Sequence, residues 1–163
     1  VDKLQNQIEN SKIELTDDEQ YAINQYISSE SYKINELLRE SNRFPEIYKK
    51  MIDDLDRALE KCHNYNGNIV RVLEISDNEK LNTFIKANEI NKTITFKEYL
   101  SFSNKPNYNT NANVMIYTIS SKAKDLRKFN PEESEILYPR NSSFIVENVI
   151  KENNKFYILW REL

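Results

Sequence analysis

The sequence predicts an α+β domain in which helices come first and strands follow. Apolar residues recur at helical intervals through residues 15–63, whereas alternating and β-branched runs dominate residues 64–163. The chain has 163 residues, the size of one domain that can bury a core, and it carries no internal repeat. We therefore expect a single domain over residues 15–163, made of a helical flank and a mostly β core, with residues 1–14 as a lead-in or linker.

Three helices are expected in the flank. The first begins near Thr16, because Glu19 follows three residues later at the spacing of a capping box. Residues 28–31 break its apolar pattern, and a second helix over residues 32–39 keeps its apolar residues on one face. The third begins near Pro45, a residue suited to a first helical turn, and carries a long apolar stripe.

A turn at residues 64–68, which contains Gly67, separates the two halves. The β half is expected to hold one more helix, over residues 78–89. Residues 104–113 are predicted to form a polar loop, and residues 121–131 a charged, mobile loop. The expected strands span residues 69–75 (buried), 113–120, 134–138, 142–150 and 155–163, with a turn at Asn153 and Asn154 between the last two.

The composition excludes several classes of function. Lys plus Arg number 23 against 26 Asp plus Glu, a formal net charge of -3, which provides no basic footprint for nucleic acid and no polybasic patch for a membrane. Cys62 and His63 are the single cysteine and histidine, so no internal disulfide, no Cys-based zinc site and no metal are expected. No apolar run approaches the roughly 20 residues of a membrane span.

Glycine scarcity limits how a nucleotide could be held. Gly67 is the single glycine, so neither a GxGxxG nor a Walker A loop can be written. Side chains and ordinary backbone amides would have to bind a nucleotide. Val1 is not a natural start and no signal peptide is visible, so we expect an excised or processed domain.

Two carboxylates, Glu133 and Glu135, stand one residue apart at the mouth of an apolar run. If that run is a strand, side chains at i and i+2 point to the same face, and both charges are aimed at one spot. Their repulsion disfavours this arrangement unless something cationic lies there. A cationic transition state beside a guanidinium acceptor would fit.

Four segments carry a resemblance to a known family. Arg71 stands on a predicted strand, and residues 96–103 contain an aromatic, hydrophobic, Ser-x-Ser pattern with Phe102 at its centre. Residues 133–135 read Glu-Ser-Glu and precede an apolar strand, a Pro-containing turn and a second strand, while residues 32–39 read Tyr-x-Ile-Asn-x-x-Leu-Arg. In order and spacing this set resembles the R-S-E mono-ADP-ribosyltransferases, which include the catalytic domains of bacterial ADP-ribosylating toxins.

The resemblance implies an ADP-ribosyltransferase-like mixed β-sheet core and a reaction that moves ADP-ribose from NAD to an arginine side chain, with release of nicotinamide. Glu135 would stabilise the cationic ribose, and Glu133 would hold or deprotonate the acceptor guanidinium. Ser101 would orient Glu135 and line the nicotinamide pocket. NAD is the implied substrate, and no metal is required.

The resemblance also implies the groups that contact NAD and the target. Arg71 would bind the diphosphate through parallel hydrogen bonds, and Asn35 and Tyr32 would border the nucleotide. The family often places an aromatic residue three positions before the first Glu to recognise the target protein. Here Asn130 stands at that position and Phe129 precedes it.

Purely structural interpretations of the same residues stay open. The carboxylates could form a solvated strand edge, Arg71 a structural ion pair, Ser101 a turn cap, and Tyr32 a core residue. Two rival functions follow: an NAD glycohydrolase, or a non-catalytic toxin-like module that binds a protein through its helices or through residues 122–131.

The implied partners are a target protein bearing an acceptor arginine and a possible delivery domain, with no nucleic acid and no membrane span. The implied location is that of a secreted or delivered bacterial effector acting in the cytosol of a target cell. The absence of disulfides is compatible with that reducing compartment.

Overall fold

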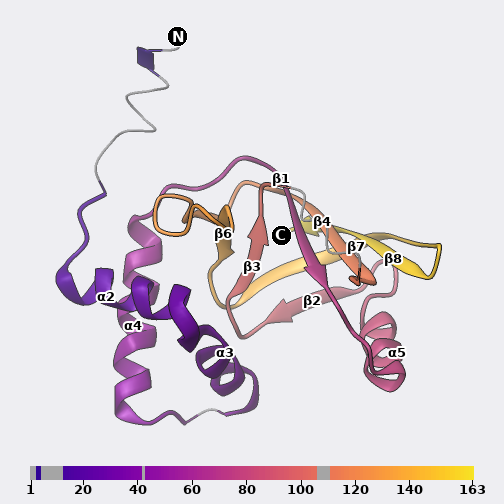
Figure 1. The fold of residues 1–163 in the computed structure, drawn as a ribbon, viewed down its shortest axis with the longest axis horizontal. Coiled ribbons are helices and arrows are strands. Elements are labelled where there is room, and N and C mark those ends of the chain that lie inside the picture. The colour runs from indigo at the N-terminus through magenta and orange to yellow at the C-terminus, as the bar shows by residue number, and fades with distance from the viewer. Residues whose placement is uncertain (1–2, 5–12, 42, 106–110) are drawn as a thin grey trace.

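A computed structural model describes residues 3–4, 13–41, 43–105 and 111–163 of the chain. Helices α2 (Asp17–Gln25), α3 (Ser31–Glu40) and α4 (Glu46–Lys61) lie together on one side of a mixed sheet, and helix α5 (Asn78–Ala87) lies at the far end of that sheet (Figure 1). The predicted α+β architecture with an N-terminal helical flank is confirmed. The expected lead-in at residues 1–14 lies largely outside the described residues.

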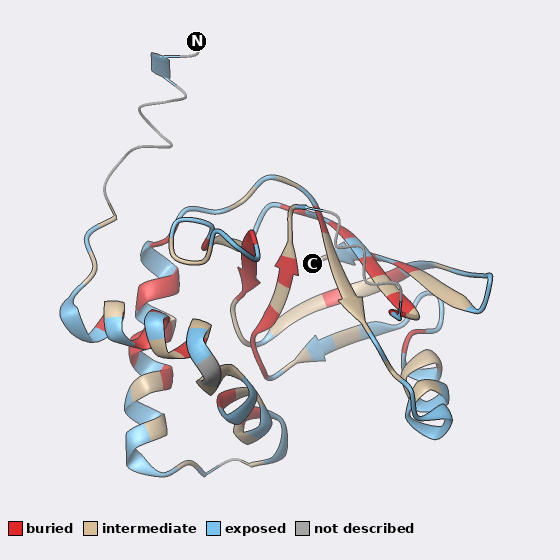
Figure 2. Cartoon of the chain, in the orientation of Figure 1, coloured by how far each residue is buried: buried red, intermediate tan, exposed pale blue. Residues whose placement is uncertain are grey.

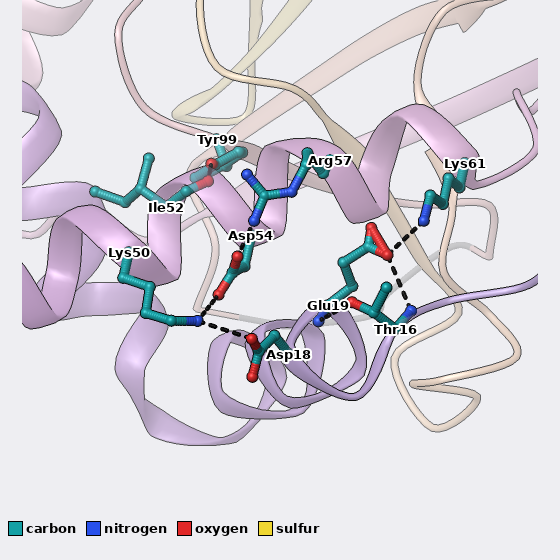
Figure 3. A network of polar contacts seen from close by, with 9 residues as sticks. All are labelled: Thr16, Asp18, Glu19, Lys50, Ile52, Asp54, Arg57, Lys61 and Tyr99. Atoms are coloured by element: carbon teal, nitrogen blue, oxygen red, sulfur yellow. Dashed lines mark hydrogen bonds and ion pairs between the residues drawn. The ribbon is translucent and has the colours of Figure 1, made fainter.

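The first helix of the flank, α2 (Asp17–Gln25), begins at the predicted capping box. The backbone N–H of Glu19 donates to Thr16 Oγ1 at 3.2 Å, and the backbone N–H of Thr16 donates to Glu19 Oε1 at 2.9 Å. The Glu19 carboxylate is buried and also accepts from Lys61 Nζ at 2.5 Å, so the cap ties α2 to the end of α4 (Figure 3).

The prediction of a helix break at residues 28–31 was wrong. A π-helical turn, η1 (Tyr26–Glu30), continues α2 into α3 (Ser31–Glu40). A π turn accommodates one extra residue, so the pattern shifts while the helix goes on. Tyr26, the first residue of η1, and Ile34 in α3 are both buried. The third predicted helix is α4 (Glu46–Lys61), for which Pro45 is the residue before the first turn.

The strands form one eight-stranded sheet in the order β2-β7-β8-β4-β1-β3-β6-β5. Among the described strands β4 and β8 run parallel, and the other neighbouring pairs run antiparallel. The bounds are β1 (Gly67–Leu73), β2 (Thr93–Phe96), β3 (Leu100–Ser103), β4 (Val114–Ser120), β5 (Lys124–Asp125), β6 (Glu135–Tyr138), β7 (Ser142–Glu152) and β8 (Lys155–Glu162), with α5 (Asn78–Ala87) after β1.

The sheet has a weak joint between β1 and β3. Their ladder consists of one recorded residue pair, Val70 with Ser103, whereas β1 and β4 are paired over seven residues. The joint separates a five-stranded part from the small β3-β6-β5 part. The candidate site lies at this joint.

Two cores lie on either side of the small part of the sheet (Figure 2). Tyr99 and Leu137 pack with the helices, while Phe102 and Ile136 pack with the aromatic core of the sheet around Trp160. All four residues of β6 are buried, because alternate side chains of this strand face different cores. The helices and the sheet therefore share β3 and β6.

Several expectations for the β half need correction. Gly67 and Asn68 begin β1 and do not form a turn, and Ile69 is the one buried residue of that strand, because β1 borders an open cavity. Strand β2 was not expected: it is four residues long, too short to show a pattern. The predicted mobile loop at residues 121–131 contains β5 and the buried Leu126, so it packs on the fold. The expected loop at residues 104–113 lies partly outside the described residues.

Candidate active site

Strands β3 and β6 bring Ser101 and Glu135 together. The register pairs Ser103 with Glu135 and Ser101 with Leu137, so Ser101 reaches Glu135 diagonally across the ladder. Ser101 Oγ donates to Glu135 Oε2 at 2.5 Å. This short bond joins two side chains that the sequence singled out separately.

The carboxyl group of Glu135 lies in an environment that disfavours its charge. The residue is 4% exposed. The pKa of Glu135 is raised from 4.5 to about 7, mainly because the carboxyl group is buried; the hydrogen bond from Ser101 and the charge of Arg71 lower the pKa, and the charge of Glu133 raises it. Glu135 therefore changes its protonation state near neutral pH.

Glu133 does not lie on the strand, and the expectation that a strand pleat would aim both carboxylates was wrong. Residues 131–134 form a turn, Ser134 has a φ of +47°, and β6 begins only at Glu135. The chain changes direction between the two acids, which leaves Glu133 exposed and Glu135 buried. Asn130 Nδ2 donates to Glu133 Oε2 at 3.2 Å and holds the exposed acid.

A cavity of about 600 Å³ nevertheless receives both carboxylates. It is formed where β1, β3 and the turn before β6 meet, with the start of α3 at its rim. Five of the residues predicted or implied for the site line this cavity: Tyr32, Arg71, Ser101, Glu133 and Glu135. The other lining residues are Val70, Val72, Phe102, Ser103, Lys105, Glu132 and Ser134.

Arg71 places a cation beside this pair. Its Nη1 donates to the backbone oxygen of Ser101 at 2.9 Å. Burial lowers the pKa of Arg71, and the nearby Tyr26, Glu98 and Glu135 oppose that effect. A guanidinium remains protonated in proteins, so the cavity contains a fixed positive charge on one wall and carboxylates on another.

Three predicted residues lie behind or beside the cavity. Asn35 Nδ2 donates to the Tyr26 hydroxyl at 3.1 Å, and its Oδ1 accepts from the backbone N–H of Tyr99 at 3.1 Å. Phe129 is half-buried against the helical core, and Asn130 bonds to Glu133. None of the three lines the cavity, and their contact with a nucleotide or a target stays a prediction.

Sequence reasoning missed other members of the site. Lys105 and Glu132 line the cavity, and no sequence pattern marks either of them. Arg39 Nη1 donates to Glu98 Oε2 at 3.2 Å, and the charge of Arg39 acts on Arg71. Arg39 ends the Tyr-x-Ile-Asn-x-x-Leu-Arg run, so that run contained the signal that could have found it.

The described part of the chain contains no group of three or more His, Cys, Asp or Glu residues that could hold a metal ion. No helix in that part is long and apolar enough to cross a membrane. Burial raises the pKa of the Cys62 thiol to about 11, so this cysteine is a weakly reactive packing residue.

Two sequence comparisons relate the chain to known proteins. The family model of the ADP-ribosyltransferase exoenzymes matches residues 4–162. A curated relative, NAD(+)--protein-arginine ADP-ribosyltransferase Tre1 from Serratia proteamaculans, is 27% identical over 150 residues, which cover 91% of this chain and 33% of the relative. The chain thus spans about a third of that relative's length.

Solved structures share the fold. An ADP-ribosyltransferase from Clostridium botulinum has a TM-score of 0.76 at 21% identity, covering 93% of this chain and 89% of its own. ADP-ribosyltransferase Vis, a toxin from Vibrio splendidus solved with agmatine, has a TM-score of 0.73 at 19% identity, covering 94% and 76%. At these identities the likeness concerns the fold.

Proposed function

Because this chain belongs to the ADP-ribosyltransferase exoenzyme family, we propose that it transfers ADP-ribose from NAD to arginine side chains of a target protein. One observation carries the proposal: a buried carboxyl group, Glu135, bonded to Ser101, shares its cavity with the exposed carboxylate of Glu133 and with Arg71. The name of the relative Tre1 and the agmatine bound to Vis support arginine as the acceptor.

We propose that NAD occupies the cavity at the joint of the sheet. Its volume of about 600 Å³ lies within the usual range for ligand sites. Arg71 would bind the diphosphate by charge-assisted hydrogen bonds, and Tyr32 at the rim would border the nucleotide. This arrangement replaces the glycine-rich loop that the sequence cannot form.

The proposed chemistry breaks the bond between nicotinamide and ribose. The nicotinamide nitrogen leaves with the bonding electron pair, and positive charge develops on the ribose. Glu135 in its carboxylate form would accept a hydrogen bond from a ribose hydroxyl and stabilise that charge, with Ser101 fixing its orientation. Burial strengthens this electrostatic effect because little water screens it.

Glu133 is proposed to act on the acceptor. A guanidinium is a poor nucleophile because it is protonated in water. The Glu133 carboxylate would hold the acceptor guanidinium at the cavity mouth and take a proton from it as nitrogen bonds to the ribose carbon. Its exposure suits this role, since a protein side chain can enter from solvent only at the open end.

Labelled NAD and agmatine test the proposal with the purified chain. We expect Glu135→Gln to abolish both agmatine labelling and release of nicotinamide. Glu133→Gln should lose agmatine labelling but keep slow release of nicotinamide. Glu132→Gln is the matched control, because Glu132 lines the same cavity and has no assigned role. Equal product formation by all three variants would refute the assigned roles.

Hydrolysis of NAD is the second candidate. The exposure of Glu133 favours it, because water can take the place of the acceptor at that end. Nicotinamide release without agmatine labelling in the unmodified chain would establish a glycohydrolase. Calorimetry that detects no NAD binding would instead favour a non-catalytic binding module.

We further propose that the chain works as a toxin-type effector in the cytosol of a target cell, where it meets a protein with an accessible arginine. Phe129 and Asn130 lie four and three positions before Glu133, to which Asn130 bonds, and they would contact that protein. A delivery domain or partner would bring the chain there. Mass spectrometry of arginines modified in a treated cell lysate would identify the target.

A further inference from the structure

One carboxylate on α4 contacts the ends of both strands that carry the proposed catalytic groups. The Tyr99 hydroxyl, just before β3, donates to Asp56 Oδ1 at 2.5 Å. Arg140 Nε, two residues after β6, donates to Asp56 Oδ2 at 2.7 Å. Each oxygen of Asp56 thus accepts from a different strand end, and both contacts lie at the end of the ladder where Leu100 pairs with Tyr138.

Both donors are suited to this carboxylate. Burial raises the pKa of Tyr99, and the charge of Asp56 raises it further, so the hydroxyl keeps its proton and donates. Burial alone would lower the pKa of Arg140, but the bond to Asp56 outweighs that effect and raises it. Hydrogen bonds to an ionised acceptor are shorter and stronger than neutral ones. Asp56 therefore attaches both strand ends to α4 through charge-assisted hydrogen bonds.

The β3–β6 pair needs an attachment of this kind to keep its position. Each strand has four residues, and β3 is joined to the larger part of the sheet by one residue pair. The bond between Ser101 and Glu135 crosses the ladder diagonally, so its length depends on the twist and offset of the two strands. A small shift of one strand would separate Ser101 Oγ from the carboxylate.

We propose that Asp56 is a positioning residue, which holds Tyr99 and Arg140 so that β3 and β6 keep the offset that joins Ser101 to Glu135. Asp56 does not line the cavity and acts through these two strands. The kinetic part of this inference rests on the proposed function. The structural part concerns the bond between Ser101 and Glu135 and stands without it.

The same helix supplies a matched control, Asp54. Its carboxylate is also ion-paired: it accepts from Lys50 Nζ at 2.7 Å and contacts Arg57 (Figure 3). Lys50 in turn lies 3.0 Å from Asp18. Asp54 thus bonds to two side chains of its own helix, of which Lys50 reaches α2, and it has no recorded bond to the described residues of β3 or β6. Asp56 instead contacts the ends of both strands.

Asp56→Asn replaces one accepting oxygen by an amide N–H, so either Tyr99 or Arg140 loses its acceptor. We expect kcat for nicotinamide release to fall by about tenfold while KM for NAD changes by less than about twofold. Tyr99→Phe, which keeps the ring and its packing, should lower kcat in the same direction. Asp54→Asn should leave kcat within about twofold of the unmodified chain.

Carbon NMR of the glutamate carboxyl groups gives a readout that needs no activity. We expect the Glu135 carboxyl to titrate at higher pH in Asp56→Asn, because a loosened Ser101 no longer lowers its pKa, and at an unchanged pH in Asp54→Asn. An unchanged Glu135 titration in folded Asp56→Asn, or equal shifts in both variants, would overturn the inference. If the unmodified chain releases no nicotinamide, the proposed function fails, while the titration still decides the role of Asp56.

Discussion

The burial that suits Glu135 to its proposed catalytic role also lowers the stability of the folded chain at high pH. Its carboxyl group is buried, and its pKa is about 7 in the folded chain against 4.5 for the free group. The folded chain therefore binds a proton more tightly there than the unfolded chain does. Stability from this group is fully present below pH 4.5 and is lost as the pH rises through about 7, because the charged form is poorly solvated.

Glu135→Gln should therefore remove activity and increase stability at alkaline pH. The difference between 4.5 and about 7 corresponds to about 3 kcal/mol, so the variant should exceed the parent by up to about 3 kcal/mol in unfolding free energy at pH 8. At pH 4 the two should be nearly equal. Urea unfolding at both pH values measures this. A stability difference that does not change between pH 4 and pH 8 would contradict it.

Ser101→Ala should shift the pH profile of the reaction. Ser101 donates to Glu135 and lowers its pKa, so without the hydroxyl the carboxylate forms only at higher pH. We expect the rising limb of kcat against pH to move upward and the plateau to fall about tenfold. Ser103→Ala is the control, because Ser103 lines the cavity and its hydroxyl accepts from the backbone N–H of Lys105, with no recorded bond to the Glu135 carboxyl group. Identical profiles for both variants would exclude a specific role of Ser101.

Single residues show where sequence reasoning succeeds. Arg71, Ser101 and Glu135 were identified from motif order, and the fold brings them into one cavity across 64 positions of chain. Lys105 and Glu98 were not identified, because their significance depends on neighbours far away in the sequence. A motif records what the chemistry needs, while a supporting residue is recognised only from its contacts.

At the scale of elements, the turn before β6 decides the separation of the two carboxylates. The strand was expected to include Ser134, since residues 134 and 135 lead directly into the apolar run that begins at Ile136. Ser134 instead has a φ of +47°, which places it in the left-handed region, so β6 begins only at the next residue, Glu135. Periodicity could not reveal this, because one residue with a changed φ leaves the apolar pattern intact.

Substitution of Ser134 tests that turn. Glycine adopts a positive φ freely, so Ser134→Gly should fold and keep its labelling of agmatine within about threefold. A β-branched residue is strained there, so Ser134→Val should lose about 2 kcal/mol or more of stability and most of the labelling. Chemical unfolding and the agmatine assay measure both effects. If Ser134→Val matches the unmodified chain in both, the turn does not hold Glu133 in place.

The π-helical turn η1 is another element that the sequence did not predict. An apparent break at residues 28–31 hid a continuous run from α2 to α3. That run places Tyr26 close to the site, where its hydroxyl accepts from Asn35. π turns occur often at functional sites, and here the turn ends two residues before Tyr32, which lines the cavity. Sequence periodicity assumes a constant 3.6 residues per turn and therefore misreads such an insertion.

For the whole molecule, helices and sheet depend on each other. Tyr99, Leu126 and Leu137 come from the β half yet are buried with the helices. Asp56 and Asn35 bond to Tyr99 from the helical side. The helical flank and the β half therefore share a buried core, and residues of both line the cavity. That the two halves fold as one domain stays a prediction.

A fragment of residues 64–163 should therefore not fold alone. Without the flank, Tyr99 and Leu137 would be exposed to water. Exposure of each large side chain lowers the free energy of unfolding by about 2 kcal/mol or more. We expect poor dispersion of its amide NMR signals and no cooperative unfolding. Mixing it with a fragment of residues 1–63 should restore dispersion and labelling of agmatine, because the contacts between the halves need no chain connection. A well-folded β fragment would show that the flank is a separate domain. It would also show that β3 and β6 fold without the support of Asp56.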